Sequence, residues 1–324
     1  MYDDKRILII DQLNLFFRNY IVNPSLSTNG MPIGGLKGCF QSIQKICREA
    51  KPDLIFICWD GPGGSKKRAL MNKDYKAGRK PIRLNRSVRN MSTEQEVENK
   101  VWQQTRIIEY YNCVPVIQFM FDGTEADDII AYLAQAKELE NAEKLIFSSD
   151  KDFFQLLGSK TIQYRPVQKE ILNQGSILEK FEIHPNNFAM ARAMVGDKSD
   201  NIDGLEGLGL KTVAKRFPFL KEDKSTTFTD LLEYSQERAK DTNIKAYQKV
   251  IDNVDILKRN YHMMQLYAPI LDITSKKKIR EVINNPDLSF NKTELIKMMM
   301  KDGFGEINFI ELFQHFNKIS IDNR

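Results

Sequence analysis

The sequence predicts an α/β fold in which helices flank a mostly parallel central sheet. Near-continuous apolar runs are typical of strands covered on both faces, and three of them end in an aspartate, at residues 6–11, 54–60 and 144–150. A fourth run, at 114–119, leads into Asp122. Helical patterns separate these runs, at residues 36–50, 94–111 and 126–139. Because strands and helices alternate, the strands should run parallel, and sites in such sheets form at the carboxyl ends of the strands.

The chain divides into three predicted parts. They are an α/β core at residues 1–186 with a basic arch at about 65–100, a helical region at 187–260 and a C-terminal helical region at 261–324. In the second part, helices are expected at residues 187–195, 211–217 and 229–239, and no further strand core is convincing. A glycine-rich turn at 204–209 lies among these helices.

The composition is that of an ordinary globular protein. Of 324 residues, 42% are hydrophobic and 28% are charged, and no apolar run is long enough to span a bilayer. The N-terminus does not have the pattern of a signal peptide. The four cysteines form no CxxC pair, so we expect reduced thiols in an intracellular protein. We further expect a cytoplasmic monomer with no membrane partner, in the host cytoplasm if the chain is phage-encoded.

Basic residues are concentrated at positions 65–90, although the net charge is only +5. This stretch holds a single acid, Asp74, so its positive charge must be solvated or meet a polyanion such as nucleic acid. Because it has few large apolar residues, we expect a mobile excursion from the sheet domain. Its basic residues are Lys66, Lys67, Arg68, Lys73, Lys76, Arg79, Lys80, Arg83, Arg86 and Arg89.

The acidic residues fall in separate clusters, each of which also has an ordinary structural explanation. Asp11 and Asp60 end strands, where an aspartate is often only a turn former. The acids at 125–128 and 150–152 begin helices and could be caps, although Glu125 and Asp128 share a helix face. The candidate carboxylates are Asp11, Asp60, Glu125, Asp127, Asp128, Asp150, Asp152, Asp197 and Asp200.

Taken together, these clusters predict a metal site. If the strands form one sheet, several carboxylates meet at one edge, where they repel one another and need cations. Oxygen ligands without His or Cys select Mg²⁺, with Mn²⁺ as a substitute. His184, His262 and His315 lie in no acidic cluster, which argues against zinc.

The glycine-rich turn is not a Walker A loop, because Leu210 separates Gly209 from Lys211. A helix-hairpin-helix turn fits better, since glycines let backbone N–H groups approach phosphates and nearby basic residues add charge. A plain glycine-rich helix connector is the alternative. The residues expected at DNA in this turn are Gly204, Gly207, Gly209, Lys211, Thr212 and Lys215.

A set of ordered motifs covers residues from about 5 to 220. They are IIDQLNLFFRNY, WDG at 59–61, YKAGRKP at 75–81, EADDIIAYLA at 125–134, SSDKDFFQLL at 148–157, GDKSDN at 196–201 and GLEGLGLKT at 204–212. The set resembles the 5′→3′ exonuclease/flap endonuclease family, which includes the 5′-nuclease domain of bacterial DNA polymerase I and stand-alone phage ribonucleases H. The chain departs from the family at Gln12 and Leu13, where a glycine is common. The length and the lack of a polymerase domain suggest the phage type.

The resemblance implies a PIN-like nuclease core with a helical arch and a helix–three-turn–helix region. The candidate carboxylates match the family's ligands for two Mg²⁺ ions, and the glycine turn matches a duplex-binding element that often holds K⁺. Lys76 and Arg79 match arch residues that contact the scissile phosphate, and Tyr75 could stack on a base. Lys66, Lys67 and Arg68 are expected to contact DNA.

The expected function is two-metal hydrolysis of phosphodiester bonds in DNA and RNA·DNA hybrids, at 5′ ends, nicks or flaps, which suits removal of RNA primers in replication. A single-stranded DNA-binding protein is an expected partner by analogy only. Two alternatives remain: a junction-binding protein without catalytic activity, and a PIN-like ribonuclease for single strands. The first leaves the acids unexplained, and the second does not need the glycine turn.

Overall fold

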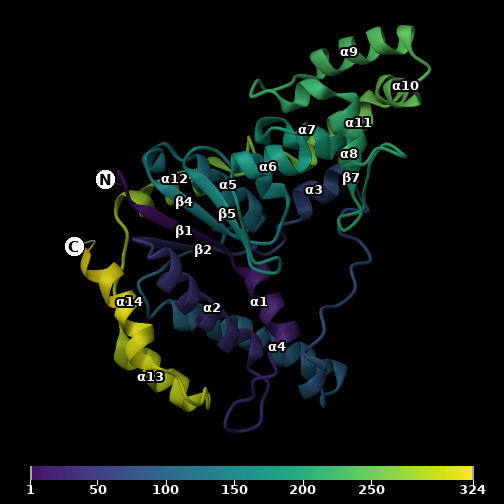
Figure 1. Cartoon of the computed structure of the whole chain (residues 1–324). Coiled ribbons are helices and arrows are strands. Elements are labelled where there is room, and N and C mark those ends of the chain that lie inside the picture. Colours follow the sequence, from purple (N-terminus) through teal and green to yellow (C-terminus); the bar gives the residue numbers. More distant parts are fainter. Residues whose placement is uncertain (1, 323–324) are drawn as a thin grey trace.

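The computed structural model describes residues 2–322 and contains a six-stranded sheet with the order β3-β2-β1-β4-β5-β6 (Figure 1). The first five strands are parallel, and β6 pairs antiparallel to β5 at the edge. The strands are β1 (Arg6–Asp11), β2 (Leu54–Cys58), β3 (Ile117–Phe119), β4 (Glu143–Phe147), β5 (Thr161–Arg165) and β6 (Glu170–Leu172). The predicted α/β class is therefore confirmed.

Helices cover both faces of this sheet. In Figure 1, α1, α2 and α4 lie below it, and α5 and α12 lie above it. The α-helices that surround or adjoin the sheet are α1 (Gln12–Val22), α2 (Gly34–Ala50), α3 (Lys66–Met71), α4 (Thr93–Tyr111), α5 (Ala126–Gln135), α12 (Ile273–Asn284), α13 (Lys292–Lys301) and α14 (Phe309–Asp322). Short 3₁₀ turns occur at Arg86–Val88, Lys137–Leu139 and Asp152–Leu156. Strands β1 and β2 are almost wholly buried, as their apolar runs predicted.

A second apolar core lies beside the first. Phe188, Phe217, Leu231 and Leu257 are completely buried in it. Its elements are α6 (Gln174–Phe181), α7 (Pro185–Val195), α8 (Leu210–Arg216), α9 (Phe228–Asp241), α10 (Lys245–Asp252), α11 (Val254–Met264), a 3₁₀ turn at Pro218–Lys221 and a small ladder of β7 (Gly196–Asp197) and β8 (Ile202–Asp203). Helices α9 and α10 project furthest from the sheet (Figure 1).

The C-terminal helices pack on the sheet domain. Ile279, Leu295 and Phe316 belong to the same buried cluster as the strands of the sheet. The hydroxyl of Tyr2 donates to the carbonyl of Ile283 at 2.6 Å, which ties the N-terminal segment to α12. Helices α12, α13 and α14 therefore complete the first core.

Two features differ from the sequence expectations. Strands β5 and β6 were not predicted, because β5 alternates buried and partly exposed residues and includes the polar Gln163 and Arg165. The basic stretch contains one short α-helix, α3, and one 3₁₀ turn. Its irregular part is anchored at two points: the N–H of Lys76 donates to Asp200 O at 3.0 Å and that of Asn85 to Tyr20 O at 3.2 Å. No helix within residues 2–322 is long and apolar enough to cross a membrane.

Candidate active site

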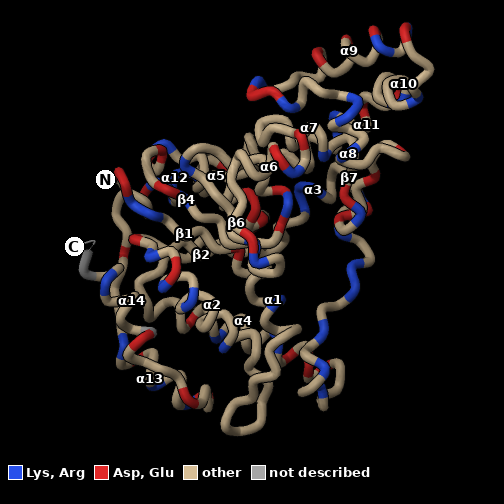
Figure 2. Tube along the Cα trace, viewed as in Figure 1, with Lys and Arg blue, Asp and Glu red and all other residues tan. Residues whose placement is uncertain are grey.

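A cavity of about 210 Å³ opens at the carboxyl ends of the parallel strands. One wall is acidic, and the other comes from residues 68–82 of the basic stretch. Acidic and basic positions lie close together beside α3 in Figure 2. The charged residues lining the cavity are Asp11, Asp60, Asp127, Asp150, Asp152, Asp200, Arg68, Lys76 and Arg79. The fold therefore brings together acids from all five predicted clusters at the carboxyl ends of the strands.

Backbone geometry explains how the acids are held. Asp11 is the last residue of β1 and caps α1 by accepting from Asn14 N at 3.2 Å. Its other carboxylate oxygen accepts from the hydroxyl of Ser148, at 2.8 Å. Asp60 lies just beyond β2 and accepts from Ala126 N at 2.6 Å, at the start of α5. These contacts fix the carboxylates but supply no positive side chain.

The loop after β4 adds further carboxylates. Asp150 accepts from the N–H of Asp152 at 2.8 Å, so the two side chains sit on one short turn. The side chain of Asp127, in the first turn of α5, makes no hydrogen bond or ion pair with any residue between 2 and 322. The caps foreseen from the sequence are thus partly present, but they leave Asp127 without a structural partner.

Burial, together with repulsion between neighbouring acids, raises the pKa values of these carboxyl groups. Burial and the charge of Asp60 raise the pKa of Asp11 to about 7. Burial followed by repulsion from Asp150 raises the pKa of Asp127 well above its ordinary value. The pKa values of Asp60 and Asp150 are raised chiefly by desolvation. A cation would relieve both the desolvation and the repulsion, and all-oxygen donors suit a hard divalent ion.

The carboxylates share the cavity without forming a preformed metal cage. Among residues 2–322, no three acidic, His or Cys side chains are close enough together, as they stand, to hold a metal ion. The case for a metal rests on the donor chemistry and on the uncompensated charge.

Glu125 and Asp128 converge, as their spacing predicted, but they converge on Arg68. The guanidinium donates to Glu125 Oε2 at 2.5 Å, to Asp128 Oδ2 at 2.8 Å and to the carbonyl of Met263 at 2.8 Å. Neither carboxylate lines the cavity. Burial raises the pKa of Glu125, but the charges of Arg68 and Lys76 more than offset it, so the pKa lies below its usual value.

Arg68 and Tyr75 were expected to face DNA, and both are instead buried. Arg68 is 4% exposed, and its guanidinium forms buried ion pairs with the carboxylates of Glu125 and Asp128. Tyr75 is 7% exposed, packs with Ile202 and Met263, and donates its hydroxyl to Glu125 at 3.1 Å. Both side chains act as anchors of the basic stretch, and Tyr75 also lines the cavity.

Lys76 and Arg79 do reach the cavity. Lys76 lies in the left-handed region, with φ 57°, and its ammonium is 2.5 Å from Glu125 Oε1. Arg79 forms an ion pair with Asp200 and donates through Nε to Ser199 O at 3.2 Å. The side chain of Asn201 donates to the carbonyls at positions 74 and 77. The basic stretch is therefore docked on the loop at 197–201, in contrast to the expected mobile excursion.

Arg192, in the last turn of α7, is a site residue that the sequence interpretation missed. It donates to Asp152 Oδ1 at 3.1 Å and to Asp197 Oδ2 at 2.5 Å. Burial opposes its charge, but the two carboxylates more than offset this effect and raise its pKa. One feature of the sequence could have indicated this residue: Arg192 lies one helical turn before Gly196, where the acidic turn begins. Ser148 and Asn14 were also missed, because ordinary polar residues near an acid carry no signal.

The glycine turn is exposed and close to basic side chains. Gly204 packs so tightly that an added Cβ would lie 2.1 Å from Val195 O, which explains this glycine by internal packing. Gly207 has φ 78°, so its conformation favours glycine. Gly209 has neither constraint, since an added Cβ would meet nothing within 4 Å. Lys211 and Lys215 are exposed, as is Lys66, whereas Thr212 and Lys67 are half-buried.

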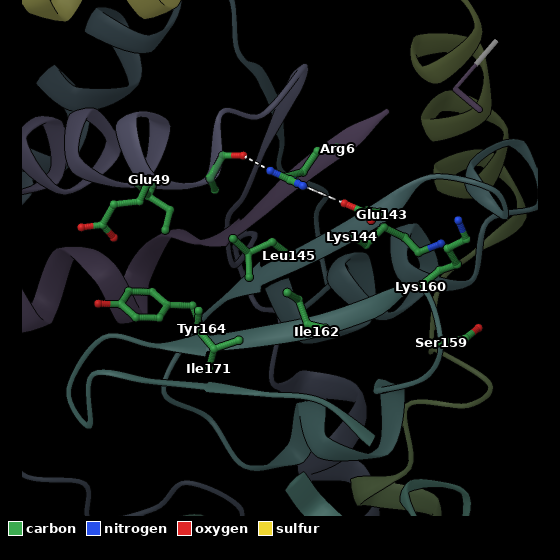
Figure 3. A pocket seen from close by; sticks show the side chains of 12 residues that line it. Arg6, Glu49, Glu143, Lys144, Leu145, Ser159, Lys160, Ile162, Tyr164 and Ile171 are labelled. Atoms are coloured by element: carbon green, nitrogen blue, oxygen red, sulfur yellow. Dashed lines mark hydrogen bonds and ion pairs between the residues drawn. The ribbon is translucent and has the colours of Figure 1, made fainter. Parts of the chain in front are cut away.

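A second, larger cavity, of about 410 Å³, lies at the opposite end of the strands. Figure 3 shows Leu145 and Ile162 among its apolar lining and the contact between Arg6 and Glu143 at its rim. Arg6 also donates to the carbonyl of Ala50 at 2.6 Å. This cavity contains no group of carboxylates comparable with the acidic wall.

Comparison with known proteins gives a consistent family assignment. Residues 6–182 match the family model described as the 5′-3′ exonuclease, N-terminal resolvase-like domain. A 5′-3′ exonuclease of Aquifex aeolicus is 24% identical over 310 residues, which is 94% of this chain and 96% of that protein. The thermostable DNA polymerase I of Thermus thermophilus is 29% identical over 211 residues, which is 65% of this chain but only 23% of the polymerase.

The fold also matches a solved structure. A bacteriophage T5 flap endonuclease, described as a pseudo-enzyme–product complex with DNA and metal ions, aligns with a TM-score of 0.64. The sequences are 18% identical, and the match covers 93% of this chain and all of the other. At this identity the likeness establishes the shared fold, including its extension through the helical regions beyond residue 182.

Proposed function

This chain belongs to the 5′-3′ exonuclease family, and from that premise we propose that it is a Mg²⁺-dependent nuclease acting at 5′ ends, nicks and 5′ flaps. The observation that carries the proposal is the cavity in which uncompensated aspartates face Lys76 and Arg79. A cavity lined by both basic side chains and acids suits hydrolysis of a phosphodiester. The basic side chains neutralise the phosphate, and a metal held by the acids activates water. The metal-bound T5 relative supports the same chemistry.

The residues proposed to hold the metal fall into two groups. Bound Mg²⁺ would supply an activated water and stabilise charge on the attacking and leaving oxygens, and Mn²⁺ can take its place. The first group lies nearest the strand ends, and the second lies on the loops next to the basic stretch. The first group is Asp11, Asp60, Asp127 and Asp150; the second is Asp152, Asp197 and Asp200.

The remaining site residues have positioning roles. Lys76 and Arg79 are proposed to hold the scissile phosphate and to neutralise its charge. Glu125 and Asp128 hold these basic residues in place, through Arg68 and Lys76. Cleavage on this scheme leaves a 5′-phosphate and a 3′-hydroxyl.

The proposed substrates are duplexes that end in a nick or flap, including RNA·DNA hybrids. Gly209 supports a close approach of the DNA backbone, because nothing in the chain itself needs a glycine there. Backbone contacts carry no base information, so both DNA and the RNA strand of a hybrid would be accepted. Primer removal in replication, K⁺ at the glycine turn and a single-stranded DNA-binding partner belong to this same proposal.

Cleavage of labelled substrates tests the proposal. A 5′ flap, a nicked duplex, an RNA·DNA hybrid and a single strand are each labelled at the 5′ or the 3′ end and incubated with Mg²⁺ or EDTA. We expect Mg²⁺-dependent release of short 5′ products from the flap and the nick, and from the RNA of the hybrid. Asp150→Asn serves as the catalytic control.

Each alternative function predicts a different result. Salt-sensitive binding without cleavage, unchanged in Asp150→Asn, would favour the junction-binding protein. Faster cleavage of the single strand than of the flap would favour the ribonuclease for single strands. Either result would exclude the nuclease proposed above.

A further inference from the structure

The acidic wall of the cavity is divided into two halves that differ in charge balance. In the first half, none of the aspartates forms an ion pair with a basic residue in the described part of the chain. In the second half, Arg192 pairs with Asp152 and with Asp197, which does not itself line the cavity, and Arg79 pairs with Asp200. Direct ion pairs with basic side chains are therefore confined to the second half, and the acids of the first half feel Lys76, Arg79 and Arg192 only from a greater distance. The unpaired acids are Asp11, Asp60, Asp127 and Asp150.

Arg192 is held rigidly between its two carboxylates. Its Nε donates to Asp152 Oδ1 at 3.1 Å, and its Nη2 donates to Asp197 Oδ2 at 2.5 Å. Its Nη1 donates to the carbonyl of Gly196 at 3.1 Å, so three donors fix the plane of the guanidinium. The residue is 9% exposed, and water therefore screens these contacts little.

The same oxygens would be needed by a divalent ion in the second half. Asp197 Oδ2 is bound by Arg192, and Asp197 Oδ1 accepts from both the N–H and the hydroxyl of Ser199, at 2.8 and 2.7 Å. An ion that entered between Asp152 and Asp197 would have to break the contacts of Arg192. That step leaves a buried guanidinium without its partners, which opposes binding.

We propose that Arg192 is a built-in cation that takes the place of a divalent ion between Asp152 and Asp197. The protein without DNA then binds one ion tightly, in the unpaired half, and a second ion weakly, because the second must displace the guanidinium. This inference rests on the proposed function, since it assumes that the unpaired half holds a metal. It makes Arg192 a positioning residue that sets the number of ions bound.

Metal binding to the full-length chain tests this role without measuring activity. Mn²⁺ is titrated into the DNA-free protein, and bound ions are counted by electron paramagnetic resonance and calorimetry. Wild type should bind one ion tightly and a second at least about tenfold more weakly. Arg192→Met should tighten the second site by at least about tenfold, whereas Arg192→Lys, which keeps the charge, should remain closer to wild type.

Arg106→Met is the matched control, because Arg106 also pairs with two acids, Glu109 and Asp302, but neither of them lines the cavity. It should bind Mn²⁺ as wild type does. If Arg192→Met binds two ions with unchanged affinities, or loses the second ion, the inference is overturned. If wild type binds no Mn²⁺ at all, the proposed function itself fails, so the two failures are distinct.

A stability measurement covers the case in which Arg192→Met does not fold without metal. Arg192→Gln keeps hydrogen-bond donors but no charge, and its Tm is followed as Mn²⁺ increases. The inference requires that Mn²⁺ raise the Tm of this variant by more than it raises the Tm of wild type. Equal increases in the two proteins would contradict it.

Discussion

The ammonium of Lys76 lies 2.5 Å from Oε1 of Glu125, at the wall of the acidic cavity. The same carboxylate accepts from Arg68, Ser65 and Tyr75, so Glu125 gathers four side chains of one segment. Lys76 is thereby held in the cavity before any substrate arrives. A charge that is already in position needs little reorganisation when a phosphate enters, which is how preorganised electrostatic stabilisation works.

Replacement of Lys76 with methionine should slow the chemical step more than it weakens DNA binding. We expect the single-turnover cleavage rate of a 5′ flap to fall by about 100-fold, since one preorganised donor is lost. The dissociation constant of the flap, measured in Ca²⁺, should change by less than about threefold, because one phosphate contact among many contributes modestly. Lys80→Met is the control, since Lys80 is exposed and does not line the cavity, and its cleavage rate should stay near that of wild type. Equal losses in the two variants would show that only the general charge of the segment matters.

Asp127→Asn should abolish cleavage and yet stabilise the metal-free protein. Asp127 has no hydrogen-bond or ion-pair partner within residues 2–322 and is repelled by Asp150 and Asp11. Removal of its charge should raise the Tm in EDTA by about 1–3 °C and lower cleavage in Mg²⁺ by more than about 100-fold. Differential scanning calorimetry and flap cleavage measure the two effects. A lower Tm in EDTA would show that the carboxylate stabilises the fold and is not an uncompensated charge.

Arg68→Met should be strongly destabilising. The change removes the guanidinium that pairs with the buried carboxylates of Glu125 and Asp128. Removing one partner of a buried ion pair lowers the free energy of unfolding by about 3–5 kcal/mol. Urea denaturation gives the free energy of unfolding. Lys66→Met, on the exposed side of the same helix, should change it by less than about 0.5 kcal/mol. Similar stabilities for the two variants would mean that Arg68 is not a structural anchor.

Gly209→Ala should weaken DNA binding without loss of stability. The added methyl meets no atom of the chain within 4 Å, so the free energy of unfolding should stay within about 0.5 kcal/mol of wild type. If DNA approaches the turn closely, affinity for a nicked duplex should fall several-fold when it is measured by fluorescence anisotropy. Gly158→Ala also places its methyl in open space and lies away from the turn, so it should bind as wild type does. Unchanged affinity in Gly209→Ala would remove this turn from the DNA surface.

Local patterns were enough to predict the centre of the sheet and the acids at its edge. Strands β1, β2 and β4 each contain an unbroken apolar run, and burial on both faces requires that composition. Strand β5 escaped prediction because Gln163 and Arg165 are polar yet buried, and their partners are carbonyls and acids elsewhere in the chain. Periodicity cannot reveal a strand whose polar residues are satisfied by tertiary contacts.

The C-terminal helices show a similar limit. The local pattern predicts that these segments are helical, but it does not show which surface of the protein they pack against. Ile279 and Phe316 join the core formed by strands that precede them by more than a hundred residues. Only the completed sheet provides the apolar surface that these helices cover.

The sequence by itself determined the α/β class, the ordered acidic and basic motifs and the meeting of aspartates at the strand ends, because these depend on short-range periodicity and on the geometry of parallel strands. Tertiary structure alone decided which acids are free and which are paired. Arg68 reaches Glu125 and Asp128 across 57 and 60 residues, and Arg192 reaches Asp152 across 40. Ion pairs between segments so far apart leave no local pattern, and they separate the carboxylates available to a metal from those that hold the basic residues in place.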